Sequence, residues 1–257
     1  MMRSMRLTNK SIIVTGAGSG IGEGIAKRLA QEGASVIVND IHPQGGERVA
    51  HAIKAAGGQA HFVAADMTKT AEVQALVQTA LAQFGRLDAF VNNAGWTHRN
   101  QPALDVSEDE FDRCYAVNVK SIYLSTLHAT PIFRKAGGGS FINIASTAGL
   151  RPRPGLTWYN GSKGAVITTS KSLAAELGPD NIRVNCINPV FNPTTGLGAD
   201  FAGGELTEER LAKFRATIPL GRFSTALDVA NAVLYLASDE AAFISGVCIE
   251  VDGARCV

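Results

Sequence analysis

The chain has 257 residues, of which 46% are hydrophobic and 18% are charged, a composition typical of a globular rather than a disordered protein. A net charge of +1 provides no basic surface for nucleic acid or anionic lipid, and no apolar run reaches the ~18 residues of a membrane span. The four cysteines are isolated, the five histidines show no metal-binding spacing, and no apolar leader follows the first methionine, so we expect a reduced, cytoplasmic protein without a metal site.

The first predicted strand, residues 11–15, is a short apolar run that leads directly into a glycine-rich turn. A helical pattern of apolar residues follows the turn. The backbone N–H groups of the turn and the positive end of the helix dipole would therefore face an anion such as a phosphate. The spacing, Gly16-x-x-x-Gly20-x-Gly22, matches neither the usual dinucleotide-binding motif nor a P-loop.

The second predicted strand, residues 34–40, ends in Asp40 roughly twenty residues after the glycine turn. A carboxylate at this place accepts hydrogen bonds from the 2′-hydroxyl of an adenosine ribose and repels a 2′-phosphate, so Asp40 favours NAD over NADP. The alternative is an aspartate that only initiates a turn, since His42 and Pro43 follow it.

Strands and helices continue to alternate along the chain, which predicts an α/β fold with a parallel sheet and helices on both faces. Right-handed crossovers then give a doubly wound order. No linker, repeat or low-complexity tract divides the chain, so residues 1–257 are predicted to form a single domain. The segment at about 190–206 follows a strand end, where ligands bind in such folds, and is predicted to be a substrate lid. The further expected strands are 59–65, 87–91, 141–145, 182–187 and 247–251, and the further helices are 43–56, 69–84, 108–133 with a break at Pro131, 207–217 and 226–238.

Tyr159 and Lys163 are one helical turn apart, and Ser146 follows the strand 141–145, so the three side chains could meet at a strand end. An ammonium ~4 Å away would lower the phenol pKa from ~10 by about three units at most, and burial would raise it. Such a tyrosine could act as an acid/base near neutral pH. The alternative is a helix with a surface tyrosine and a solvated lysine, because the Tyr-x-x-x-Lys spacing is common.

Six motifs occur together in one order, from about Asn9 to Asp252. They are Thr15-Gly-x-x-x-Gly20-x-Gly22, Asp66, Asn92-Asn-Ala-Gly95, Asn118, Ser146 with Tyr159-x-x-x-Lys163, and Asn188-Pro189. In order and spacing the chain resembles the short-chain dehydrogenase/reductases. The resemblance implies a single Rossmann-like domain with a seven-stranded parallel sheet, a nicotinamide cofactor and a homotetramer.

The resemblance also assigns roles to individual residues. It makes Tyr159 the acid/base, Ser146 the hydroxyl that orients the substrate, and Lys163 the residue that lowers the tyrosine pKa and binds the nicotinamide ribose. Asn118 would anchor a proton-relay water, although alone it could be an ordinary helix residue, and Ser146 a cap. With Tyr159 and Lys163, the expected cofactor-binding residues are Gly16, Ser19, Gly20, Ile21, Gly22, Asp40, Ile41, Asp66, Met67, Asn92, Ala94, Gly95, Pro189 and Thr194.

The chain departs from the family pattern at Val190, where the family usually has glycine, and this puts the local backbone conformation in question. A smaller change is Ala254 in place of the last glycine of a Val-Asp-Gly-Gly pattern. Arg151 and Arg153 could meet an anionic substrate or only water. Candidates for the substrate pocket, which could equally be core residues, are Trp96, Leu156, Trp158, Phe191 and Phe201.

The expected function is that of an NAD(H)-dependent oxidoreductase acting on a small secondary alcohol/ketone pair, with NADP less suitable. The first alternative is a 3-oxoacyl-carrier-protein or acyl-CoA reductase, because the chain is similar to such reductases as well as to sugar and cyclic-alcohol dehydrogenases. Gly178-Pro-Asp-Asn181 lacks the basic residues that carrier-protein reductases tend to show there, which ranks the alcohol dehydrogenase first. The second alternative is a non-catalytic NAD-binding sensor, which the intact Ser, Tyr, Lys and Asn set disfavours.

Overall fold

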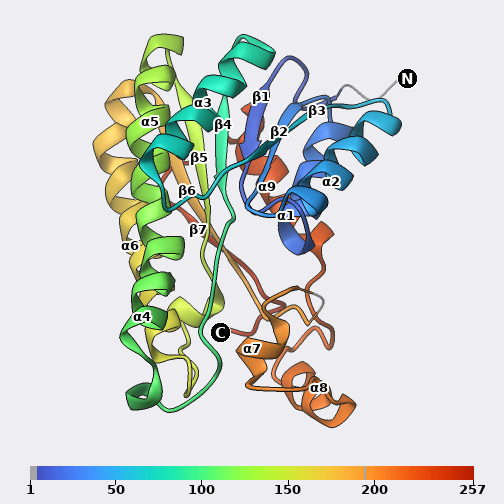
Figure 1. The fold of residues 1–257 in the computed structure, drawn as a ribbon, viewed down its shortest axis with the longest axis vertical. Coiled ribbons are helices and arrows are strands. Elements are labelled where there is room, and N and C mark those ends of the chain that lie inside the picture. Colours follow the sequence, from blue (N-terminus) through green and yellow to red (C-terminus); the bar gives the residue numbers. More distant parts are fainter. Residues whose placement is uncertain (1–4, 194) are drawn as a thin grey trace.

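The strands form one parallel sheet in a computed structural model that describes residues 5–193 and 195–257 (Figure 1). They are β1 (Ser11–Val14), β2 (Ser35–Asp40), β3 (Gln59–Ala64), β4 (Ala89–Asn92), β5 (Gly139–Ile144), β6 (Ile182–Pro189) and β7 (Cys248–Val251). The seven strands lie in the order β3-β2-β1-β4-β5-β6-β7, and each neighbouring pair is parallel. The expected α/β class, parallel sheet and doubly wound order are thus confirmed.

Helices connect the strands and cover both faces of the sheet. They are α1 (Gly20–Gln31), α2 (Pro43–Ala55), α3 (Thr70–Phe84), α4 (Glu108–Tyr115), α5 (Ser121–Ala136), α6 (Thr157–Leu177), α7 (Gly198–Ala202), α8 (Glu208–Arg215) and α9 (Ala226–Ala237). In Figure 1, α1, α2 and α9 lie over one face, and α3, α5 and α6 lie over the other. The short helices α7 and α8 lie beyond the carboxyl ends of the strands.

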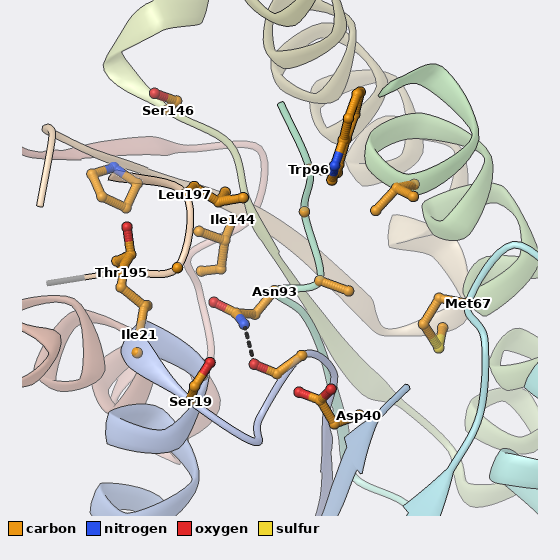
Figure 2. Close-up of a pocket in the computed structure, with 18 of the residues that line it drawn as sticks. Ser19, Ile21, Asp40, Met67, Asn93, Trp96, Ile144, Ser146, Thr195 and Leu197 are labelled. Carbon is orange, nitrogen blue, oxygen red and sulfur yellow. Dashed lines mark hydrogen bonds between the residues drawn. The ribbon is translucent and has the colours of Figure 1, made fainter. Parts of the chain in front are cut away.

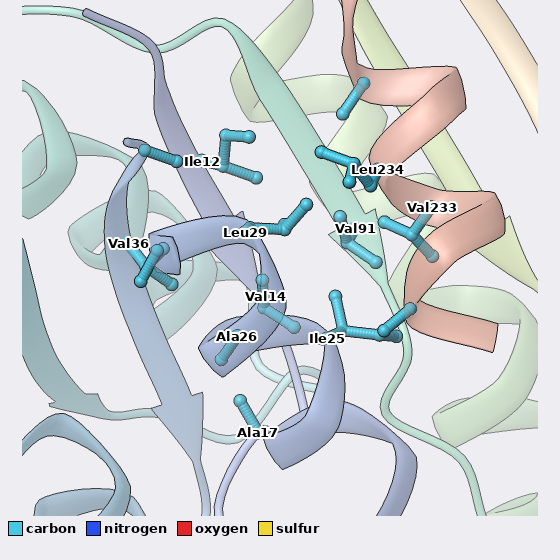
Figure 3. Packing of buried hydrophobic residues seen from close by; sticks show 14 of the residues in the cluster. Ile12, Val14, Ala17, Ile25, Ala26, Leu29, Val36, Val91, Val233 and Leu234 are labelled. Atoms are coloured by element: carbon cyan, nitrogen blue, oxygen red, sulfur yellow. The ribbon is translucent and has the colours of Figure 1, made fainter. Parts of the chain in front are cut away.

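Alternate residues of the central strand point to opposite faces, and each face has its own apolar core. Ile12 and Val14 belong to the cluster that packs between β1, α1 and α9, as Figure 3 shows. Ile13 belongs to the cluster on the other face, together with Phe90 of β4. Because both faces are covered, the central strands are apolar throughout, which is why short apolar runs predicted them correctly.

The helix expected at 108–133 with a break at Pro131 is longer than predicted and is not broken there. It runs from Glu108 to Ala136 as α4, a π-helical segment (Ala116–Lys120) and α5, with Pro131 inside α5. Proline leaves the carbonyl four residues before it without an N–H partner. That residue is Leu127, which is exposed, so water can bond its carbonyl. The irregular segment lies instead around Asn118, and π-helical turns often mark functional sites.

Within residues 5–193 and 195–257, no helix combines the length and the apolar character that a bilayer span requires. The same residues contain no group of three His, Cys, Asp or Glu side chains placed to hold a metal ion. The cysteines are free thiols, of which Cys114 and Cys186 are buried while Cys248 and Cys256 are partly exposed.

Candidate active site

A cleft of about 440 Å³ opens at the carboxyl ends of the strands, where β1 and β4 pair although they are distant in the sequence. Open α/β sheets bind ligands at such switch points. Figure 2 shows Ser19 and Asp40 on one side of this cleft and Trp96 and Ser146 on the other. The predicted cofactor turn and the predicted catalytic residues therefore share one cleft.

The glycine turn forms a narrow cradle between β1 and α1. Gly16 has a left-handed backbone (φ 59°), and a Cβ on Gly22 would lie only 2.1 Å from the Gly16 carbonyl oxygen. Ser19, the residue before α1, makes no side-chain cap, so the first N–H groups of the helix are open to an anion. Glycine at position 22 thus lets the turn pack closely against α1, and the open N–H groups of the helix suit the diphosphate of a dinucleotide.

Asn93, which the sequence did not single out, supports this turn. Its amide nitrogen donates to the carbonyl oxygens of Thr15 at 2.8 Å and of Gly16 at 3.1 Å, the second of which is drawn in Figure 2. Its neighbour Asn92, an expected cofactor residue, points the other way and does not line the cleft. The Asn92 amide instead donates to Asn143 at 2.8 Å and joins β4 to β5. Asn92 therefore supports the sheet, since successive strand residues face opposite sides, and its contact with a cofactor stays a prediction.

The carboxylate of Asp40 is fixed on the wall of the cleft. It accepts hydrogen bonds from the backbone N–H groups of Gly18 at 2.8 Å and His42 at 2.9 Å. The Arg48 guanidinium donates to the carbonyl of Gly18, whose N–H is bonded to Asp40, at 3.0 Å and is paired with Glu23 at 2.9 Å. The hydrogen bond from Arg48 lowers the pKa of Glu23 to about 2, which keeps this pair ionised at neutral pH. Asp40 thus presents a negative charge to any 2′-group, and Arg48 is already occupied.

The wall beyond Asp40 is formed by residues at and after the ends of β2 and β3. Ile41, Asp66 and Met67 all line the cleft as predicted. The Asp66 carboxylate accepts bonds from the N–H and the hydroxyl of Thr68, both at 2.8 Å, which fixes its orientation. Asn39 also lines this wall and was not predicted.

Tyr159 and Lys163 lie on α6 with their side chains in the cleft, and both are almost completely buried, at 6% and 4% exposure. The Ser146 hydroxyl bonds the Tyr159 phenol and also accepts from the Ala148 N–H at 3.1 Å. The Lys163 ammonium donates to the Ile144 carbonyl at 2.9 Å. The predicted Ser, Tyr and Lys are thus brought together where β5 ends and α6 begins.

The electrostatics of this group differ from the expected close ion pair. The Lys163 nitrogen lies 5.9 Å from the centre of the Tyr159 ring, and burial, opposed by the hydrogen bond from Ser146, raises the pKa of Tyr159 to about 12. Burial also lowers the pKa of Lys163 to about 8. Burial, which was expected to oppose the effect of lysine, is the larger influence at this distance, so the pKa of Tyr159 lies above its usual value of ~10 and not below it. In the chain alone, Tyr159 is a neutral proton donor at pH 7.

Asn118 lies in the π-helical segment and holds the cleft wall in place. Its side-chain oxygen accepts from the Trp96 N–H at 2.8 Å, and its amide donates to the Trp96 carbonyl at 2.9 Å and to the Ser162 hydroxyl at 2.9 Å. Asn118 itself does not line the cleft. Its side chain therefore fixes the backbone of Trp96. Ala94, Gly95 and Trp96 line the cleft.

Three of the five predicted substrate-pocket residues, Trp96, Phe191 and Phe201, line the cleft. The other two belong elsewhere, because Leu156 is completely buried in the core and the Trp158 indole donates to the Ala103 carbonyl at 3.0 Å. Two residues that the sequence did not suggest, Arg113 and Val117, join the lining. They lie one helical turn apart, Arg113 on α4 and Val117 in the π-helical segment, and no motif in the sequence marks them.

The two arginines considered for an anionic substrate lie outside this cleft. Arg151 donates to the Arg255 carbonyl at 2.6 Å. The guanidinium of Arg153 lies over the rings of Phe214 at 4.7 Å and Phe201 at 5.6 Å, behind the aromatic wall. Burial there lowers the pKa of Arg153 to about 10.

The segment after β6 closes the cleft on one side. Pro189 and Val190 line it, and Val190 is not among the non-glycine residues with positive φ in the described chain, which are Asn9, Asn181 and Ala254. The Cβ of Val190 is therefore accommodated where the family has glycine. Thr194, the expected nicotinamide contact, lies outside the described residues. The next residue, Thr195, lines the cleft opposite Gly20, with 3.7 Å between its methyl group and the place of a Cβ on that glycine.

Comparisons with known proteins agree on one family over almost the whole length. A family model described as Enoyl-(Acyl carrier protein) reductase matches residues 16–254. The 4-formylbenzenesulfonate dehydrogenase TsaC1/TsaC2 of Comamonas testosteroni is 51% identical over 98% of this chain and 99% of its own. Cyclopentanol dehydrogenase of a Comamonas species is 38% identical over 96% of this chain and 97% of its own. The crystal structure of 3-ketoacyl-(acyl-carrier-protein) reductase from Brucella melitensis complexed with NADH is 44% identical, with a TM-score of 0.91 over 98% of this chain and 100% of that one.

Proposed function

The chain belongs to the short-chain dehydrogenase/reductase family, and on this basis we propose that it interconverts an alcohol and a carbonyl compound with Tyr159 as the acid/base. Members with this much similarity are alcohol and aldehyde dehydrogenases and 3-oxoacyl reductases, so the chain is an oxidoreductase that acts on CH–OH groups. It uses NAD(H), the cofactor form bound in the Brucella structure. The observation that carries the mechanism is the buried Ser146–Tyr159 pair in the same cleft as the glycine turn.

In the reductive direction, a nicotinamide held in this cleft would supply the hydride for the carbonyl carbon. Tyr159 gives its proton to the developing alkoxide, and the Ser146 hydroxyl bonds the same oxygen and holds it in place. One hydride and one proton thus convert the carbonyl compound to the alcohol, and oxidation is the reverse. Lys163, protonated below its pKa of about 8, would bond the nicotinamide ribose and favour the ionised form of Tyr159.

The cofactor would lie along the cleft from the glycine turn to α6. Gly16, Gly20 and Gly22 with Ser19 and Ile21 would face the diphosphate, which the cradle and the open helix N-terminus support. Asp40 would bond the adenosine ribose, and Ile41, Asp66 and Met67 would border the adenine. The remaining contacts toward the nicotinamide would come from Ala94, Gly95, Pro189 and Thr195.

The segment 190–206 would act as a substrate lid on the single domain 1–257. It contains α7, and Phe201 of this helix sets its ring edge-on to Tyr159 with the ring centres 5.9 Å apart. Phe191 at the start of the segment stacks on Phe201 at 5.1 Å. An apolar cover over the reacting atoms would exclude water while the proton and hydride move.

NAD should be preferred over NADP by at least about tenfold in kcat/KM, because each charge of a 2′-phosphate ~4 Å from Asp40 costs about 1–4 kcal/mol. The Arg48 guanidinium offsets this little, since Glu23 already pairs with it. Asp40→Ser should lower the ratio of kcat/KM with NAD to kcat/KM with NADP, while kcat with NAD should change little. Initial rates with both cofactors check this, and equal efficiency in the wild type would contradict the role of Asp40.

Two observations name candidate substrates. The Comamonas relative is named for an aromatic aldehyde with a sulfonate group, and the Brucella structure for a 3-ketoacyl group on a carrier protein. A screen that follows NADH absorbance should therefore include secondary alcohols, sulfonated benzaldehyde and a 3-oxoacyl thioester. Turnover of the thioester above all others would favour the acyl reductase. Tight NAD binding without turnover of any compound would favour the sensor.

We also infer a homotetramer in the cytoplasm, where the free thiols would stay reduced. The α5 helix exposes Tyr123 (60%) and Leu127 (47%), and β7 is an edge strand, so apolar surface remains for two-fold contacts. Light scattering at micromolar concentration should give a mass near four times the 27.0 kDa of one chain. A stable monomer would contradict this assembly.

A further inference from the structure

Arg113 is a cation in the lining of the cleft that the proposed hydride transfer does not use. It lies on α4 and is exposed, and its guanidinium carbon is 4.7 Å from the centre of the Trp96 ring. Val117, one helical turn later, also lines the cleft. This face of the helix therefore turns toward the cleft, and Arg113 lies beside Trp96 in its wall.

The charge of Arg113 has no counter-ion in the part of the chain that the structure describes. Stacking on Trp96 is its only side-chain interaction there, and its neighbours Asp109 and Asp112 form no ion pair with it. Arg153 also stacks on aromatic rings but lies behind the wall, and Arg151 bonds a backbone carbonyl. A guanidinium with unused N–H groups can bind a sulfonate or carboxylate through two parallel hydrogen bonds.

The aromatic surface beside this charge is held rigidly. Both the N–H and the carbonyl of Trp96 are bonded to the Asn118 side chain, so the backbone from which the indole projects is held in place. Phe191 and Phe201 form the other apolar surface of the cleft near Tyr159. A planar ring would pack on these surfaces, and an anionic substituent on it would reach the guanidinium.

We propose that Arg113 selects aromatic substrates with an anionic substituent, a sulfonate or a carboxylate. This substituent is on the aromatic ring, at a position away from the reacting carbonyl or carbinol carbon. The proposal rests on the proposed function, since it assigns the substrate class of the same cleft. Arg113 is then a specificity residue: it contributes to substrate binding and takes no part in proton or hydride transfer.

Matched probes test this with NADH as cofactor: benzaldehyde, 4-formylbenzenesulfonate and 4-carboxybenzaldehyde. In the wild type, kcat/KM should be highest for the two anionic aldehydes, and added salt should reduce that preference because Arg113 is exposed. Arg113→Met should lower kcat/KM for them about 10- to 100-fold, chiefly through KM, and leave benzaldehyde nearly unchanged. Arg113→Lys should recover part of the preference for the anionic aldehydes.

Lys120→Met is the matched control. It removes an exposed cation of the adjacent π-helical segment outside the cleft and should change kcat/KM for neither the anionic aldehydes nor benzaldehyde.

Binding of 4-methylbenzenesulfonate, which has no reacting carbon, to the protein with NADH separates this proposal from the proposed function. Calorimetry should show binding to the wild type and a loss of about 10-fold or more in Arg113→Met. If no aldehyde is reduced but this binding depends on Arg113, the hydride transfer is wrong and the anion site stands. If aldehydes are reduced and Arg113→Met changes neither the anionic preference nor the binding, or if the wild type does not bind the sulfonate, the role of Arg113 is overturned.

Discussion

Tyr159→Phe is expected to lower kcat by a factor of about 10²–10⁴, because it removes the proposed proton donor. The phenylalanine ring keeps the packing against Phe201, so the fold and the affinity for NAD should change little. Steady-state rates together with a titration of NAD binding would check both expectations.

Tyr115→Phe is the control for this substitution. Tyr115 lies on α4 close to the active site, stacks on Phe111 with ring centres 4.7 Å apart, and does not line the cleft. Loss of its hydroxyl should leave kcat almost unchanged. A general acid should account for a much larger loss than tenfold. If Tyr159→Phe therefore retains more than about a tenth of wild-type activity, the proton comes from another group.

Lys163→Met is expected to produce the second large effect, a loss of kcat/KM combined with weaker NAD binding. Among the lysines and arginines that line the cleft in the described chain, Lys163 is the buried one, whereas Arg113 is exposed. Its removal takes away both the proposed ribose contact and the charge that favours the phenolate. Lys171→Met, on an exposed position two turns later on α6, should affect neither quantity.

The pH dependence follows from the two shifted groups. Burial holds the pKa of Tyr159 at about 12, so its acid form dominates at neutral pH and the reduction rate should be flat there. Oxidation needs the base form, so its rate should rise with pH into the alkaline range. Lys163 carries its charge, and so favours the phenolate, only below its pKa of about 8, so Lys163→Met should lower the oxidation rate in the part of the limb below about pH 8. An unchanged limb would show that Lys163 does not act on Tyr159.

The parts of the fold that depend on local pattern could be predicted from the sequence. Buried strands such as β1 and β2 are apolar runs, and their alternation with helices determines a parallel sheet. Asp40 at the end of β2 and Ser146 just after β5 line the cleft for the same reason, and their roles stay predictions. Pro131 was misjudged because its effect depends on whether water reaches the Leu127 carbonyl, which is a property of the packed structure.

The features that depend on contacts through space could not be predicted. Asn93 supports the glycine turn across the gap between β4 and β1, and only the strand pairing shows this. The high pKa of Tyr159 results from burial by segments distant in the sequence, whereas the spacing to Lys163 suggested the opposite shift. Arg113 joins the cleft because α4 packs beside it, and no motif in the sequence marks the residue.

A single-turnover experiment tests the role of Tyr159 most directly. Enzyme loaded with NAD is mixed rapidly with a substrate alcohol, and the first NADH formed is followed by its absorbance, before product release can limit the rate. The proposed mechanism predicts a rapid NADH phase in the wild type that speeds up with pH, and a phase at least about 10²-fold slower in Tyr159→Phe with NAD still bound. A rapid phase of similar rate in Tyr159→Phe would contradict the assignment of Tyr159 as the acid/base.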